Sequence, residues 1–218
     1  MTNITFKQGD ILKAFEKKEF DILCHQENCE GLSYFSGIAK SIHNLYPELT
    51  KLHVEFCRNK PPTNNYDFKE DKFHDRIGNK WYWLDNLVFG NYLEYKVNEQ
   101  QSIINLYAQI FRSNSSLNKI EMFDAFKYPD VETEELAVGT KDLVNDSLKN
   151  RLFALSEILE AINHNYKGKS IGLPLIASGL AATKSIKKDM SDLEYFKLMI
   201  YPIVTEKLKD VKVTIYYL

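Results

Sequence analysis

Short, mainly apolar segments alternate along this chain with longer segments of helical periodicity, and this alternation limits the fold more than any other feature. The apolar segments occupy residues 21–24, 102–108, 170–175 and 211–217. The helical segments occupy residues 37–46, 48–57, 142–165 and 193–208. A strand that is apolar on both sides is buried on both sides, so helices must cover both faces of its sheet. The pattern therefore predicts an α/β fold with a helix-covered sheet.

Further elements are predicted from local patterns. Residues 3–7 alternate as in a strand, and a short helix is expected from Ile11. Residues 80–95 are rich in Trp, Tyr, Phe and Val and predict one or two strands, with a hairpin turn at Gly90 and Asn91. Pro202 is expected to kink the last helix.

Length, charge and composition exclude several classes of protein. A chain of 218 residues suits one domain with insertions, or at most two small ones. We expect a single domain over residues 1–218, with surface insertions at 58–79 and 112–140, where the composition changes. The net charge of -2 argues against bulk nucleic-acid binding. No stretch reaches the roughly 18 apolar residues that a membrane span needs, and no leader segment is expected.

The cysteines and histidines predict neither a disulfide framework nor a metal site. Cys24, Cys29 and Cys57 form an odd set without zinc-type spacing, so we expect a reduced, cytoplasmic protein. His43 and His53 fall on expected helices and are interpreted as surface or packing residues. We expect no metal, no cofactor and a monomeric state.

The segment over residues 21–45 carries the strongest functional signal. A short buried strand stops at a polar cluster, crosses Gly31 and Gly37, and enters a helix. Such a junction places backbone N–H groups and the positive end of a helix dipole at one point, which suits a phosphate. The two glycines are also common turn residues, and they form neither a P-loop nor a G-x-G-x-x-G fingerprint.

A second strand, over residues 171–175, is followed by a small-residue loop that contains Ser178 and Gly179. Asp10, the segment from His25 to Gly37 and this loop all follow expected strands. Ligands of open α/β sheets bind outside the carboxyl ends of the strands. We therefore expect these segments to converge on one edge, where the two loops together suit two phosphates.

Asp10 and His25 each have a structural and a functional interpretation. Asp10 precedes a helix, so it can be an N-cap, and its carboxylate can also accept a hydrogen bond from a ligand amine. His25 lies just past the expected strand, where a histidine is either structural or an acid/base group. Both interpretations stay open for each residue.

An ordered set of motifs resembles a macrodomain, the ADP-ribose-binding α/β/α module, and more narrowly the yeast-type ADP-ribose 1''-phosphate phosphatases with their phage and bacterial relatives. The set covers residues 1–57 and 168–218 well and the middle loosely. Its members are residues 4–12, 25–31, 36–39, 46–47, 54–57, 101–106, 173–174, 178–180 and 213–218. The resemblance implies a three-layer α/β/α sandwich with a mixed central sheet.

The resemblance also implies roles for individual residues. Asp10, with Ile11 beside it, would bind the adenine amino group, and Asn28 would contact the distal ribose. The backbone of one loop would hold one phosphate and that of the other loop the second. These loops are Gly37, Ile38 and Ala39, and Ser178, Gly179, Leu180 and Ala181. His25 matches the histidine assigned to catalysis, so the implied activity is hydrolysis of the terminal phosphate of ADP-ribose 1''-phosphate.

Departures from the family pattern keep three alternatives open. Residues 33–36 are Ser-Tyr-Phe-Ser where the family is richer in glycine, and residues 181–183 are Ala-Ala-Thr where a glycine and an aromatic are common. The first alternative is a non-catalytic binder of ADP-ribose or a related NAD-derived nucleotide. The second is an ADP-ribosyl hydrolase on modified macromolecules, and the third is an interaction domain with a vestigial pocket.

Overall fold

The structure, a computed structural model, describes residues 4–29, 37–58, 76–77, 80–81, 88, 90–109, 148–178, 187 and 189–218. Its strands are β1 (Ile4–Gln8), β2 (Ile22–Asn28), β3 (Arg76–Ile77), β4 (Lys80–Trp81), β5 (Tyr92–Lys96), β6 (Ser102–Gln109), β7 (Ser170–Pro174) and β8 (Lys212–Tyr217). Its helices are α1 (Ile11–Glu16), α2 (Gly37–Leu45), α3 (Pro47–Arg58), α6 (Leu148–Asn165), α8 (Asp192–Met199) and α9 (Tyr201–Lys207).

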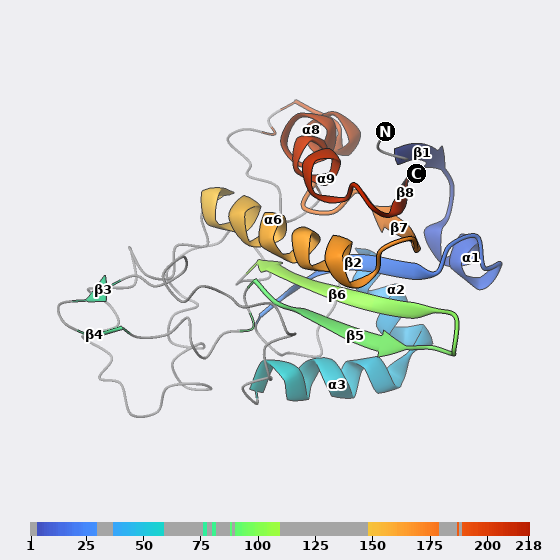
Figure 1. Cartoon of the computed structure of the whole chain (residues 1–218), viewed down its shortest axis with the longest axis horizontal. Helices are drawn as coiled ribbons and strands as arrows, with labels where there is room; N and C mark the ends of the chain where they lie inside the picture. Colours follow the sequence, from blue (N-terminus) through green and yellow to red (C-terminus); the bar gives the residue numbers. More distant parts are fainter. Residues whose placement is uncertain are drawn as a thin grey trace.

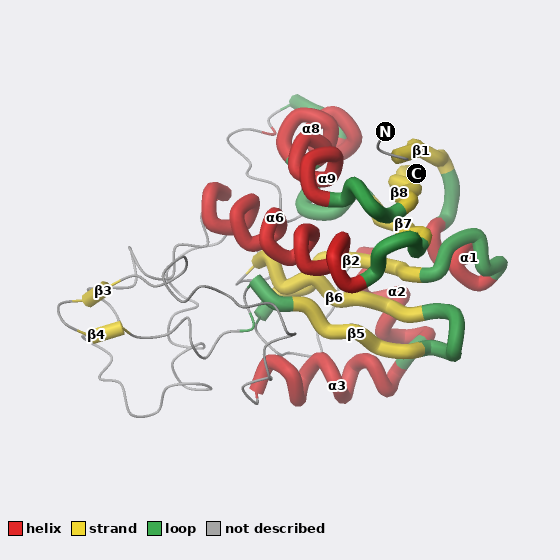
Figure 2. Tube along the Cα trace, in the orientation of Figure 1, coloured by secondary structure: helices red, strands yellow, loops and turns green. Residues whose placement is uncertain are grey.

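One mixed sheet forms the centre of the molecule, in the order β1-β8-β7-β2-β6-β5. All neighbouring pairs are parallel except β5 and β6, which are antiparallel. Helices α6, α8 and α9 lie on one side of the sheet, and α2 and α3 lie on the other (Figures 1 and 2). The predicted three-layer α/β/α sandwich with a mixed sheet is confirmed.

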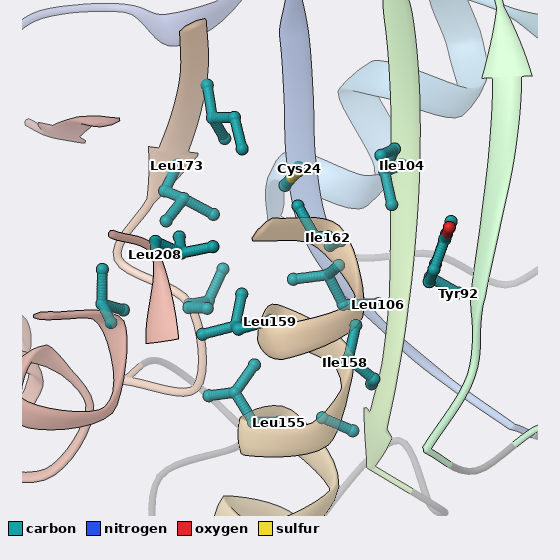
Figure 3. Packing of buried hydrophobic residues seen from close by; sticks show 14 of the residues in the cluster. Cys24, Tyr92, Ile104, Leu106, Leu155, Ile158, Leu159, Ile162, Leu173 and Leu208 are labelled. Carbon is teal, nitrogen blue, oxygen red and sulfur yellow. The ribbon is translucent and has the colours of Figure 1, made fainter. Parts of the chain in front are cut away.

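Strand alternation sends consecutive side chains into two different cores. Cys24 and Ile104 pack in the core beneath α6, which presents Leu155, Leu159 and Ile162 to the sheet (Figure 3). The preceding residues of the same strands, Leu23 and Ile103, belong to a second core with α1, α2 and α3. Because β6 is buried from Ile103 to Gln109, its apolar sequence follows from coverage on both faces.

The expected last helix is two helices, which corrects the prediction of one kinked element. α8 ends at Met199, and Ile200 has φ -105° and ψ -42° before α9 begins. Pro202 stands in the first turn of α9. Backbone N–H groups in a first turn have no intrahelical acceptor, so the missing N–H of proline costs no hydrogen bond there. α8 itself begins at a capping box in which Ser191 and Glu194 exchange hydrogen bonds.

The expected hairpin turn at Gly90 and Asn91 and the expected insertions compare with the structure as follows. Gly90 and Asn91 form a turn, because Asn91 N–H donates to the Val88 carbonyl at 3.0 Å, but the hairpin of this region joins β5 to β6. Most of the expected insertions 58–79 and 112–140 lies outside the described residues. None of the described helices has the length and apolarity that a membrane crossing requires.

Candidate functional site

The parallel pairing brings three of the predicted site segments to one edge of the sheet. Asp10 follows β1, Asn28 ends β2, and Ala177 and Ser178 follow β7. Strands β1, β8, β7 and β2 are parallel neighbours, so their carboxyl ends lie at the same end of the sheet. The three segments therefore stand at the carboxyl ends of parallel strands, as expected.

Asp10 is the N-cap of α1, and only one of its two carboxylate oxygens accepts the capping hydrogen bonds. Its Oδ1 accepts hydrogen bonds from Leu12 N–H at 2.9 Å and Lys13 N–H at 3.3 Å. Among the residues that the structure describes, none donates to Oδ2, and the side chain is exposed. The capping role and a ligand role are therefore compatible. Ile11 points its side chain into the core, so only its backbone can serve a ligand.

Gly37 opens α2 in a conformation that favours glycine. Its φ is +56°, and a Cβ there would meet no atom within 4 Å. Ile38 is partly buried and Ala39 is buried, so these two residues anchor the first turn against the core. The first N–H groups of a helix have no intrahelical partner, which leaves this turn able to hold an anion.

The turn after β7 is tight and conformationally strained. Ile176 N–H donates to the Pro174 carbonyl at 2.7 Å, and Ala177 has φ +59°. Ser178 is buried, and its Oγ donates to the Leu175 carbonyl at 2.5 Å. Its own carbonyl accepts from Lys187 Nζ at 2.6 Å. The Ser178 hydroxyl thus shapes the turn. The other predicted residues of this loop, Gly179, Leu180 and Ala181, lie outside the described residues.

His25 lies inside β2, because this strand continues to Asn28 and does not stop at Cys24 as expected. Its side chain is fully buried, and its position in the ladder faces Asn105 of β6. Burial, and after it the electrostatic interaction with His43, lowers the pKa of His25 to about 3. His25 is therefore a neutral imidazole at physiological pH.

A buried polar cluster surrounds His25 on the side of α2 and α3. Glu27 Oε1 lies 3.6 Å from His25 Nδ1 and 2.9 Å from His43 Nε2. His43 Nδ1 lies 3.0 Å from Thr50 Oγ1. His53 Nδ1 lies 2.9 Å from the Tyr107 hydroxyl. Burial raises the pKa of Glu27, while the hydrogen bond with His43 opposes the rise. Of the two interpretations of His43 and His53, as surface or as packing residues, the structure supports packing, because both are buried.

The sequence carried a signal for part of this cluster. Leu49, His53 and Cys57 recur every four residues, and all three are buried in α3. His53 thus lies on the buried stripe of its helix. Glu27 follows His25 by two residues, so the two share one face of β2. The sequence does not show that this face of β2 packs against α2 and α3.

No protein-family model matches the chain, and no curated protein matches it in sequence. Solved structures do match in fold. The macrodomain of Mycobacterium tuberculosis DarG aligns over 99% of this chain and 98% of its own, with 17% identity and a TM-score of 0.53. The macrodomain of Thermus aquaticus DarG gives 16% identity and a TM-score of 0.52, over 99% and 98% of the two chains.

A third match is Thermosipho africanus DarTG in complex with ADP-ribose, with 14% identity and a TM-score of 0.51. It covers 97% of this chain and 41% of that one. Identities this low establish architecture and leave activity open. The sheet order, the helix layers and these alignments together show that the chain has the macrodomain fold.

Proposed function

We propose that the protein binds ADP-ribose, or a derivative of it, at the carboxyl edge of the sheet. The observation that carries the proposal is the placement of Asp10 and the strained turn at Ala177 just past the carboxyl ends of the parallel strands β1 and β7. Their chemistry suits a nucleotide diphosphate, with a carboxylate for the adenine amine and backbone N–H groups for phosphate. The ADP-ribose complex of the T. africanus protein supports it, because that protein shares the fold.

Each predicted residue has a place in this proposal. Asp10 Oδ2 accepts from the adenine amino group while Oδ1 keeps its cap. Asn28, partly buried at the end of β2, contacts the distal ribose. The N–H groups of Gly37, Ile38 and Ala39 hold one phosphate. The backbone of Ser178–Ala181 holds the other.

Calorimetric titration with ADP-ribose tests the binding proposal. Asp10→Asn is the informative variant, because asparagine caps a helix about as well as aspartate while it presents an amide donor to the adenine amine. We expect wild type to bind and Asp10→Asn to bind at least tenfold more weakly, with an unchanged melting temperature. Glu48→Gln, an exposed charge change in the first turn of α3, is the matched control and should bind as wild type. Absence of binding by wild type at millimolar ligand would refute the proposal.

We further propose hydrolysis of the terminal phosphate of ADP-ribose 1''-phosphate, with His25 as the group that activates water or relays a proton. His25 is unprotonated at physiological pH, as a base must be, but a pKa of about 3 makes it a weak proton acceptor. Its complete burial favours the second candidate, a non-catalytic binder, because a catalytic group must reach the reacting atoms.

Phosphate release by wild type and by His25→Ala decides between these candidates. Release that the substitution abolishes supports the hydrolase. Equal release by both excludes His25, and release by neither, with binding intact, supports the binder. Removal of ADP-ribose from modified protein or nucleic acid is measured in parallel as the remaining alternative.

A further inference from the structure

The buried cluster on β2 and α2 has a feature that packing alone does not explain. His25 is completely buried, yet neither of its ring nitrogens has a hydrogen-bond partner among the described residues. A buried polar atom without a partner loses its interaction with water and gains nothing in return. The ring is aimed at Glu27, whose Oε1 is 3.6 Å from its Nδ1. The Asn105 side chain, opposite His25 in the ladder, also has no hydrogen-bond partner among the described residues, so a direct hydrogen bond between the two is the alternative to a bound ion.

The three side chains around this point form a set of metal ligands. One atom each from His25, Glu27 and His43 can be chosen so that all lie within 4.8 Å of one another. Glu27 Oε1 is 3.6 Å from the first histidine and 2.9 Å from the second. Ligand atoms at the usual zinc distances lie about 3.3 Å apart around a tetrahedral ion. Small side-chain rotations therefore suffice to close the three atoms around one ion.

A neighbouring hydroxyl allows His43 to become a ligand. In the absence of metal, His43 Nε2 shares a proton with Glu27. A metal on Nε2 requires that proton to leave and the remaining one to sit on Nδ1. Thr50 Oγ1, 3.0 Å from Nδ1, can accept a hydrogen bond as well as donate one, so it can hold this tautomer. A hydrogen bond on the distal ring nitrogen is the usual support of a histidine ligand.

We propose that His25, Glu27 and His43 bind a divalent transition-metal ion of the zinc class, which links the central strand to α2. Two imidazoles and one carboxylate suit this class, whereas calcium and magnesium prefer all-oxygen sites. The ion accepts the lone pair of a His25 ring nitrogen, and its positive charge balances the negative charge of the buried Glu27 carboxylate. The proposal does not depend on nucleotide binding, because none of the three side chains is assigned to binding the nucleotide. It competes with the hydrolase candidate, in which His25 is the catalytic group, because a ring nitrogen bound to the ion cannot also take up a proton.

Metal content provides the first test. Protein is purified without affinity tags that bind metal, and is also unfolded and refolded with equimolar Zn²⁺, since the buried site limits entry to the folded state. We expect a single zinc ion per chain by elemental analysis and a higher melting temperature than in metal-free protein. Glu27→Gln and His43→Gln should lose the ion. His53→Gln, a buried histidine of the same cluster outside the ligand set, and His164→Gln, an exposed one, are the matched controls and should keep it.

A second test needs wild type only, so it remains decisive if the cluster variants fail to fold. Co²⁺ replaces zinc and is paramagnetic, so it broadens the NMR signals of nearby residues. We expect broadening at Thr50 and Asn105, and none at Tyr195, which is buried in α8. Absence of bound zinc and cobalt in both preparations, or binding that survives His43→Gln, would overturn the proposal. Metal binding without ADP-ribose binding, or the reverse, separates this inference from the proposed function.

Discussion

Replacement of Gly172 by alanine tests how closely α1 and the segment after it approach the sheet. A Cβ at Gly172 of β7 would lie 2.4 Å from Phe20 Cζ and 2.5 Å from Phe20 Cε2. Carbon atoms in contact normally lie about 3.5–4.0 Å apart, so the ring must move by about 1 Å. Phe20 is buried, and its ring centroid is 5.6 Å from those of Phe15 and Tyr216, which hold it in place.

The expected cost follows from two opposing contributions. Overpacking of a filled core costs about 1–3 kcal/mol, and alanine in place of glycine in a strand recovers roughly 0.5–1 kcal/mol of chain entropy. We therefore expect Gly172→Ala to lower the free energy of unfolding by roughly 0–2.5 kcal/mol. At about 2–4 °C per kcal/mol for a chain of this size, the melting temperature falls by up to roughly 10 °C.

Urea unfolding of a double-mutant cycle measures the effect and its cause. Phe20→Leu removes the ring atoms that the new methyl group would meet. The cost of Gly172→Ala should therefore disappear, or change sign, in the Phe20→Leu background. If Gly172→Ala stabilises the wild-type protein, or costs the same in both backgrounds, the close approach of Phe20 to β7 is not what selects glycine.

Three further predictions follow from single contacts. Leu159→Ala empties a fully buried position beneath the sheet and should lower the free energy of unfolding by about 2–5 kcal/mol in urea titrations. Ser191→Ala removes the capping box of α8 and should cost ~1 kcal/mol by the same assay, whereas Ser191→Asn should cost less. Burial, and then the charge of Glu19, raises the pKa of Tyr216 to about 12. Between about pH 10 and 12 the phenol ionises in the unfolded chain but not in the folded one, so the free energy of unfolding should fall over this range. Glu19→Gln should lower the pKa of Tyr216 in an NMR titration.

The fold was predictable because its signal is repeated along the chain. The apolar segments at 102–108 and 170–175 became β6 and β7, and the spacing of Leu155, Leu159 and Ile162 became the buried face of α6. The end of β2 was not predictable from the same rule. Polar residues commonly end a strand, but the backbone pairing with β6 continues through His25 and Gln26. The side chains of Gln26 and Glu27 find partners in Gln109 and His43, which the sequence alone does not show.

The candidate site was predictable where it depends on the backbone. The parallel topology alone places Asp10 and Ala177 just past the carboxyl ends of β1 and β7. The role of Ser178 was less accessible, because its hydroxyl bonds to a carbonyl three residues before it. Such a local turn contact depends on the φ of Ala177, and alanine gives no sequence signal for a positive φ.

The polar cluster shows why a central strand constrains the helices beside it. β2 has a parallel neighbour on each edge and helices on each face, so every polar side chain that it buries needs a partner in a helix layer. Alternation sends Cys24 toward α6 and sends His25 and Glu27 toward α2 and α3. Since His43, Thr50 and His53 all come from those two helices, the polar residues of three elements gather on one side of the sheet. The apolar core that contains the α6 residues also includes Tyr107, whose hydroxyl lies 2.9 Å from His53 Nδ1. Changes in the cluster and changes in that core should therefore be coupled in their effect on stability through Tyr107.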